Sequence, residues 1–356
     1  MRKQLLWSLF LSVIFASGSP GQEAPPESSI VDLRSIGYPQ GDCKFPNAQL
    51  EFLDSVHLLV SFPLHGSSCN GTGQMQETRA AVVNVSGEVS HTLNLRSGQL
   101  VRAGPNGRIL LPTEKGLSIL GADFSELQIL PWPNEANTGQ IPFWTFAARN
   151  IYLTPSREGF AMVGPYPNYG VAYFAGDPIK LVSTTSTCSA LPAVTDGGFA
   201  CLELSPVNKL VVHLVNSVWD VEDSRFEKGE WTALPTPDRL LLLTSKFKLY
   251  EFQRGGNARE LADLSWLAPG LWNSATAYTV TSGAAHRILV SSWGCWFPLS
   301  DTTGIGYYKR ILVLDYQSGV IIYRKKSSIG SNVTISPNGR LLAIRDDNRL
   351  SLVALP

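Results

Sequence analysis

Short apolar runs recur along the sequence, and each follows a group of turn residues. The clearest copies are "GPNGRILL" at 104–111, "TPDRLLLL" at 236–243 and "SPNGRLLA" at 336–343. With weaker copies included, the turns fall near residues 54, 106, 157, 197, 238, 285 and 338. The spacing is about 40 to 53 residues, a period typical of propellers and other repeat arrays.

One repeat, residues 100–130, shows the internal order of a unit. It contains an apolar strand, a Pro-Asn-Gly turn, a second apolar strand, a short loop, a third strand, a Gly-Ala-Asp turn and a final strand. Proline presets one turn position, and glycine supplies the positive φ that another requires. Four antiparallel strands form a propeller blade, so the sequence predicts an all-β, seven-bladed β-propeller of four-stranded antiparallel blades.

The turn phrase resembles the Ser-Pro-Asp-Gly-Arg hairpin of WD40-, TolB- and YVTN-type propellers. The resemblance extends over nearly all of the chain after residue 21 and concerns the fold only, because such hairpins occur in propellers of many functions. Trp219-Asp220 is the only Trp-Asp dipeptide, and no Gly-His pattern accompanies it, so the sequence departs from true WD40 repeats.

The last repeat lacks a strand. Its strands begin near residues 331, 340 and 349, which leaves an unpaired outer edge that would favour aggregation. Residues 28–36, "SSIVDLRSI", precede the first blade and alternate, with Val31 and Leu33 on one face and Asp32 and Arg34 on the other. We predict that residues about 29–37 are the fourth strand of the last blade and close the ring.

The N-terminus predicts export. Residues 1–21 contain Arg2 and Lys3, an apolar stretch from Leu5 to Ala16 and then small residues, the order of a secretory signal peptide. The apolar stretch is shorter than the about 20 residues that cross a bilayer. The expected product is a secreted or periplasmic protein without a membrane span, with residues 22–356 forming one propeller domain.

Composition changes this interpretation little. Charged residues make up 16% of the chain, with 29 Lys and Arg against 29 Asp and Glu and no basic run, so nucleic acid is not an expected partner. No Cys-x-x-Cys pair occurs among the five cysteines, and we expect no metal and no cofactor.

We predict a disulfide between Cys43 and Cys69. The pair Cys188 and Cys201 is rejected because Cys201 should lie opposite about Ala193, leaving Cys188 out of register.

Aromatic residues gather in the long loops between second and third strands and between blades, which would share one face of the ring. Long loops on a rigid scaffold commonly bind ligands, and aromatic rings supply much of the energy of recognition. The alternative is that the rings only fill the rim between blades. The predicted binding residues are Trp132, Trp144, Tyr166, Tyr169, Trp266, Trp272, Trp293, Trp296, Tyr307 and Tyr308.

The sequence therefore predicts a monomeric, non-catalytic binding or interaction module that recognises a protein or carbohydrate ligand through its aromatic loop face. The alternative is a propeller hydrolase of lactonase or glycoside-processing type, with its site near the central channel. Such an enzyme needs ionisable groups that converge on one point. The acids available for this role are Glu203, Asp220, Glu222 and Asp301, and their spacing does not favour them over other acids.

Overall fold

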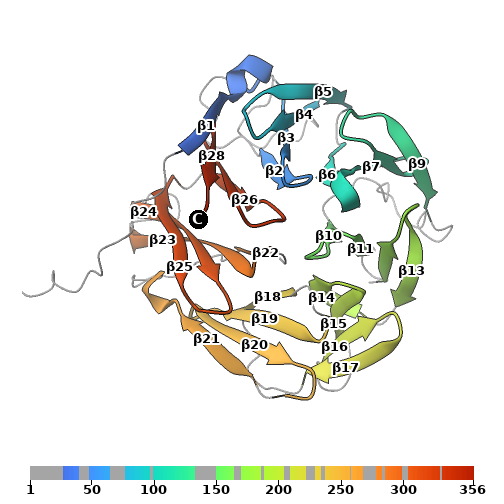
Figure 1. The fold of residues 1–356 in the computed structure, drawn as a ribbon, viewed down its shortest axis with the longest axis vertical. Coiled ribbons are helices and arrows are strands. Elements are labelled where there is room, and N and C mark those ends of the chain that lie inside the picture. The colour runs from blue at the N-terminus through green and yellow to red at the C-terminus, as the bar shows by residue number, and fades with distance from the viewer. Residues whose placement is uncertain are drawn as a thin grey trace, which may run out of the picture.

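Seven four-stranded antiparallel sheets surround a central axis in the computed structural model (Figure 1). The structure describes residues 27–39, 48–64, 77–96, 99–132, 150–163, 170–185, 188–203, 209–221, 229–233, 237–256, 258–267, 278–282, 285–298, 304–328 and 331–356. The predicted all-β, seven-bladed propeller is confirmed. Within the described residues, no helix has the length and apolar character needed to cross a membrane.

Six blades are formed by consecutive strands, counted outward from the axis. Blade one contains β2 (Gln49–Phe52), β3 (His57–Pro63), β4 (Thr78–Asn84) and β5 (Val89–Leu95). Blade two contains β6 (Arg102–Ala103), β7 (Ile109–Thr113), β8 (Gly116–Leu120) and β9 (Glu126–Pro131). Blade three contains β10 (Ile151–Leu153), β11 (Gly159–Val163), β12 (Val171–Ala175) and β13 (Lys180–Thr185).

Blades four to six repeat this order. Blade four contains β14 (Cys188–Thr195), β15 (Gly198–Glu203), β16 (Lys209–Leu214) and β17 (Ser217–Val221). Blade five contains β18 (Gly229–Ala233), β19 (Arg239–Thr244), β20 (Lys248–Gln253) and β21 (Arg259–Asp263). Blade six contains β22 (Tyr278–Ser282), β23 (Arg287–Pro298), β24 (Gly304–Asp315) and β25 (Ile321–Ser327).

The apolar runs are continuous because both faces of each blade are buried against neighbouring blades. In β19, Leu240 and Leu242 pack toward blade four, whereas Leu241 and Leu243 pack toward blade six. Successive side chains of a strand point to opposite faces, so a strand covered on both sides needs apolar residues at every position. One cluster of buried side chains lies at each of the seven interfaces between blades.

The recurrent turns join the first and second strands of the blades. In blade two, Asn106 and Gly107 have φ of 54° and 74°, a backbone region that glycine and asparagine adopt most readily. Gly339 has φ of 69° at the equivalent turn of the last blade. The Pro-Asn-Gly phrase therefore recurs because this tight turn requires positive φ values.

The last blade is closed by the N-terminal strand, as predicted. It consists of β26 (Asn332–Ile335), β27 (Leu341–Asp346) and β28 (Arg349–Ala354), and its outer strand is β1 (Glu27–Asp32). β1 runs antiparallel to β28, with Val31 opposite Leu350 and Asp32 opposite Arg349. Figure 1 shows the first and last strands of the chain side by side.

The closing strand is shorter than expected. We predicted a strand to about residue 37, but β1 ends at Asp32 and Leu33–Ile36 form a short 3-10 helix, η1. The Asp32 side chain accepts the Arg34 N–H, and Gly37 ends the helix with φ of 89°. A side-chain acceptor at the start and a left-handed glycine at the end favour this turn over further strand.

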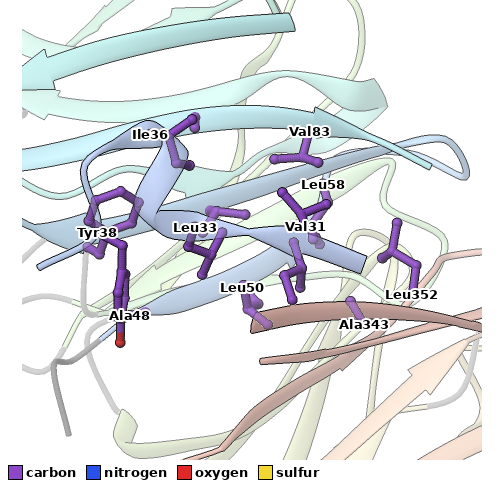
Figure 2. Close-up of a cluster of buried hydrophobic side chains, with 14 of the residues drawn as sticks. Val31, Leu33, Ile36, Tyr38, Ala48, Leu50, Leu58, Val83, Ala343 and Leu352 are labelled. Carbon is purple, nitrogen blue, oxygen red and sulfur yellow. The ribbon is translucent and has the colours of Figure 1, made fainter. Parts of the chain in front are cut away.

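The N-terminal segment also joins the last blade to the first. Val31 is 5% exposed and Leu33 is fully buried, as the predicted alternation required. Figure 2 shows these side chains together with Leu50 of blade one and Leu352 of the last blade. The segment therefore fills the seventh interface of the ring, in addition to covering the edge of β28.

Asp32 makes this closure dependent on pH. Hydrogen bonds from the Arg34 guanidinium, the Asn348 amide and the Arg34 N–H hold the pKa of Asp32 well below its ordinary value of 3.8. A depressed pKa gives stability that is present above the unfolded-state pKa and is lost as the pH falls toward the folded-state pKa. We therefore expect Asp32→Asn to lower the free energy of unfolding by a constant amount from neutral pH down to about 5, and by less below about 4. Urea unfolding at each pH measures the difference in free energy of unfolding between the unmodified chain and the variant. A difference that did not become smaller in acid would contradict a depressed pKa at Asp32.

The disulfide in the described residues joins Cys188 and Cys201, so our rejection of this pair was wrong. Their Cα atoms lie 5.5 Å apart, within the range of disulfides. Ala193 pairs with Ala200, one residue from the expected partner Cys201, and two register shifts earlier in β14 bring Cys188 opposite Glu203. Simple counting along the hairpin could not anticipate these irregularities.

Cys43 and Cys69 lie outside the described residues, and their pairing stays a prediction. In an oxidising compartment, peptide mapping without reduction should find a Cys43–Cys69 cross-link beside the Cys188–Cys201 cross-link, because disulfides persist there. A free thiol at Cys43 in the folded protein would remove the predicted pair.

Candidate binding surface

Strand order divides the connections between the two faces of the ring. The strands of a blade are antiparallel and run outward in chain order, so second-to-third connections and connections between blades share one face. We call this the loop face. It is the face to which the sequence assigned the aromatic residues. Among the predicted binding residues, Trp144, Tyr166, Tyr169 and Trp272 lie outside the described part of the chain.

Trp132 is a packing residue. It follows β9, and its ring is half-buried against the cluster between blades two and three. Its indole Nε1–H donates to the Thr113 carbonyl oxygen at 2.7 Å. A ring held by both packing and a hydrogen bond stabilises the rim, so its contacts agree with the rim-filling alternative.

Trp293, Trp296, Tyr307 and Tyr308 lie on strands, although we expected residues 291–310 to be a loop. β23 and β24 are 12 residues long, and their pairing continues to Pro298 opposite Gly304. The neighbouring strands stop earlier, since β22 pairs up to Ser291 and β25 pairs up to Lys309. Within the described part of the chain, residues 292–298 and 304–308 therefore pair only with each other, and they form a two-stranded ribbon that extends past its blade on the loop face.

Trp266 lies beside the base of this ribbon. It belongs to η6 (Ser265–Leu267), the 3-10 helix that follows the outer strand of blade five, and it is 39% exposed. Arg310 of β24 donates from Nη1 to the Trp266 carbonyl oxygen at 2.5 Å. The Arg310 Cζ atom also lies 5.9 Å from the centroid of the Trp266 ring, in the range of a cation–π contact. These two contacts fix the tryptophan against blade six.

A pocket of about 390 Å³ opens at this junction of blades five and six. Small-molecule and peptide-anchor sites commonly have about 300 to 1,000 Å³. The pocket has an apolar and aromatic part and a strongly cationic part, and its described lining residues include no acid. It is lined by Trp266, Leu267, Arg310, Ile311, Arg324, Lys325 and Lys326.

Sequence reasoning identified Trp266 and missed the four cations. "YRKK" at 323–326 and the Lys-Arg pair at 309–310 stand out in the sequence only as ends of strands. Arg310 lies opposite Lys326 across the hairpin, so aligning the two strands from their shared turn is the signal that could have located this group of charges. The preceding blade, whose η6 completes the pocket, carries no equivalent signal in the sequence.

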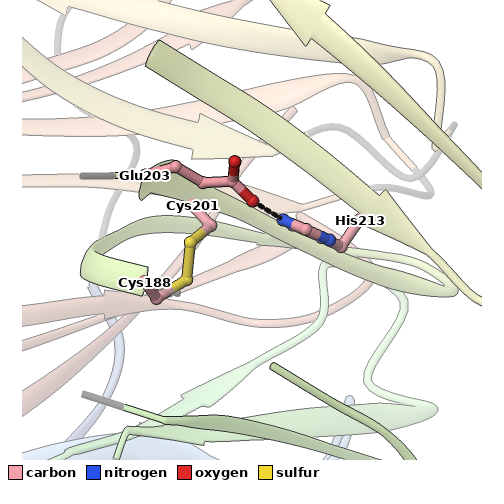
Figure 3. Close-up of a disulfide and its surroundings, with 4 residues drawn as sticks. All are labelled: Cys188, Cys201, Glu203 and His213. Carbon is pink, nitrogen blue, oxygen red and sulfur yellow. Dashed lines mark hydrogen bonds and ion pairs between the residues drawn. A yellow bond between two sulfur atoms is a disulfide. The ribbon is translucent and has the colours of Figure 1, made fainter. Parts of the chain in front are cut away.

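The acids considered for catalysis have other contacts where the structure describes them. Glu203 accepts a hydrogen bond from His213 at 2.9 Å between Oε1 and Nε2, near the disulfide (Figure 3). Asp220 is exposed on β17. Glu222 and Asp301 lie outside the described residues.

A partly buried acid, Asp196, links two blades. Burial raises the pKa of Asp196, and hydrogen bonds from the Ser156 hydroxyl and N–H oppose this rise. These bonds measure 2.7 and 3.1 Å and connect the first turn of blade three to that of blade four. Asp196 therefore holds neighbouring turns together on the face opposite the loop face.

Comparison with known proteins adds only similarity of fold. No protein-family model matches the sequence, and no curated protein matches it. The crystal structure of Kluyvelomyces marxianus Hsv2 is 13% identical over 87% of this chain and 97% of that chain, with a TM-score of 0.47. A chain in the crystal structure of a Mitotic Checkpoint Complex is 12% identical over 99% of both chains, with a TM-score of 0.49. These values assign neither a family nor a function.

Proposed function

We propose that this protein is a non-catalytic binding module that recognises a protein partner through the loop face of blades five and six. The observation that carries the proposal is the ribbon of residues 292–298 and 304–308, which pairs with no third strand among the described residues. An isolated two-stranded hairpin is marginally stable in water at best. Trp293, Trp296, Tyr307 and Tyr308 on these strands are residue types that dominate binding interfaces.

A protein ligand fits this surface better than a carbohydrate. Where the described strands leave the ribbon edges unpaired, backbone N–H and C=O groups are available for strand addition, a common mode of protein recognition. The adjoining pocket offers cations, which suit an acidic polypeptide better than a neutral sugar.

Export is part of the same proposal. The N-terminal pattern is that of a signal peptide, and disulfides such as Cys188–Cys201 persist in oxidising compartments. The module would therefore act as a monomer in a secreted or periplasmic setting, where it meets its partner directly.

Replacement of Trp293 and Trp296 by alanine should abolish capture of the partner from the native extracellular or envelope fraction. The melting temperature should change little, because no third strand among the described residues pairs with this part of the ribbon. Affinity capture followed by mass spectrometry, with thermal unfolding alongside, measures both effects. The matched control is Leu127→Ala, an exposed apolar residue on the outer strand of blade two, which should capture normally. A double variant that lost stability and retained capture would show that the tryptophans only pack.

A further inference from the structure

Three cations of the pocket share one face of blade six. Arg310 of β24 lies directly opposite Lys326 of β25, and Leu312 lies opposite Arg324. Residues that are opposite or two positions apart in antiparallel strands share a face. Leu312 packs in the cluster that contains Leu267 of η6, so this face is turned toward blade five. Arg310, Arg324 and Lys326 therefore lie on the side where Trp266 stands.

Two cations of this group, Arg310 and Lys326, lie directly opposite each other. Like charges directly opposite each other in a sheet are destabilising. Lysines on an outer strand can serve to prevent strand addition, and this would account for Lys326 and Lys325 on β25. It does not account for Arg310, because β24 is an inner strand with neighbours on both sides. Asp263, the acid nearest to Trp266 along the chain, accepts the Ser265 N–H at 2.9 Å and lies 3.8 Å from Lys248 Nζ.

The apolar part of the pocket indicates the kind of anion. Leu267 is buried beneath it, and the exposed Trp266 ring stands beside it. A bare oxyanion would use the cations and leave this apolar surface in water. A ligand with carboxylates on either side of a large apolar side chain would use both, since guanidinium groups bind carboxylates in a bidentate manner.

We propose that the pocket between blades five and six binds an acidic peptide segment, in which Asp or Glu residues flank a large apolar side chain. The carboxylates meet Arg310, Arg324 and Lys326, and the apolar side chain packs on Trp266. The segment belongs to the protein partner, so the inference rests on the proposed function and adds the chemistry by which the partner is recognised.

The test uses the fluorescein-labelled peptide EELWEE and fluorescence anisotropy with the mature chain. We expect saturable binding that weakens at least about tenfold in about 0.5 M salt, because partly exposed charges are screened. The peptides QQLWQQ and EEGGEE, which lack the charges or the apolar residues, should each bind at least about tenfold more weakly.

The variant Arg324→Gln/Lys326→Gln should bind EELWEE at least about tenfold more weakly, with an unchanged melting temperature, since both side chains are exposed. The control Lys115→Gln/Lys180→Gln removes two exposed charges from blades two and three and should bind as the unmodified chain does. An equal loss in the control, or no binding to the unmodified chain, would overturn the inference. Equal binding of EEGGEE, with displacement by glucose 6-phosphate, would assign the pocket to simple anions instead.

The two proposals can fail separately. Capture of the native partner depends on Trp293 and Trp296, whereas peptide binding depends on Arg324 and Lys326. If Arg324→Gln/Lys326→Gln captured the native partner normally while Trp293→Ala/Trp296→Ala did not, the loop-face function would stand and the acidic-peptide assignment would fall.

Discussion

A mature chain that begins at Gly41 should be unfolded or insoluble, whereas one that begins at Glu27 should unfold as the chain from residue 22 does. The shorter chain lacks β1 and η1, and with them the buried Val31, Leu33, Ile36 and Tyr38. Burial of Val31 and Leu33 alone contributes about 1.5 to 3 kcal/mol each. The total is a large part of the about 5 to 15 kcal/mol that separates folded from unfolded domains. Removal also exposes the edge of β28, which favours aggregation.

Point variants test the same closure in the complete chain. Val31→Asp places a charge in the interface between the last and first blades and should lower the melting temperature strongly. Ile30→Asp is the matched control, because Ile30 is the neighbouring residue and is 57% exposed. Differential scanning calorimetry of both variants and of the two shortened chains measures the effect. Equal melting temperatures for the chains that begin at Glu27 and at Gly41 would contradict closure of the ring by the N-terminal strand.

Arg345→Ala should have the second large effect, lowering the free energy of unfolding by about 3 to 5 kcal/mol. Arg345 is 2% exposed on β27, and its guanidinium donates to the Tyr38 hydroxyl oxygen at 2.6 Å and to Asn332 Oδ1 at 2.9 Å. It also donates to the Asp347 carbonyl oxygen at 2.9 Å. Each hydrogen bond to a charged group contributes about 1.5 to 3 kcal/mol, and the buried acceptors would lose their partner.

Two further variants separate the parts of this contact in urea unfolding. Tyr38→Phe removes one hydroxyl and should lower the free energy of unfolding by about 1 kcal/mol. Arg340→Ala is the control for loss of an arginine from the same blade and should be nearly neutral, because Arg340 is exposed in the turn before β27. If Arg345→Ala lowered the free energy of unfolding as little as Arg340→Ala, the buried guanidinium would not hold the N-terminal segment against the last blade.

The sequence predicted the architecture because repetition multiplies a weak local signal. One Pro-Asn-Gly turn before an apolar run is compatible with many folds, but seven at a regular spacing restrict the chain to a closed array. The closing strand was predictable because the last repeat lacked a partner, and Val31 and Leu33 supplied the alternation required. The change to η1 after Asp32 depended on a side-chain hydrogen bond and on Gly37, which a two-residue periodicity does not show.

The binding surface was predicted only in part. Aromatic content located Trp266, but the strand register of β23 and β24 decides that residues 292–298 and 304–308 form a ribbon. The disulfide was missed because β14 carries two register shifts that bring Cys188 near Cys201. The cationic pocket depends on contact between η6 and blade six, which are distant in sequence and meet only through the packing of blades. A local sequence pattern describes a single strand or turn, whereas a pocket of this kind forms between elements of neighbouring blades.

The most direct test of the loop-face account is hydrogen–deuterium exchange of the protein with and without its captured partner. We predict slower exchange at residues 265–267, 304–310 and 324–326, because a bound segment would cover the ribbon and the pocket beside Trp266. The turns at 104–108 and 154–158, on the opposite face, should exchange at the same rate in both states. Protection confined to those turns, with exchange in the ribbon and pocket unchanged, would contradict binding through the loop face of blades five and six.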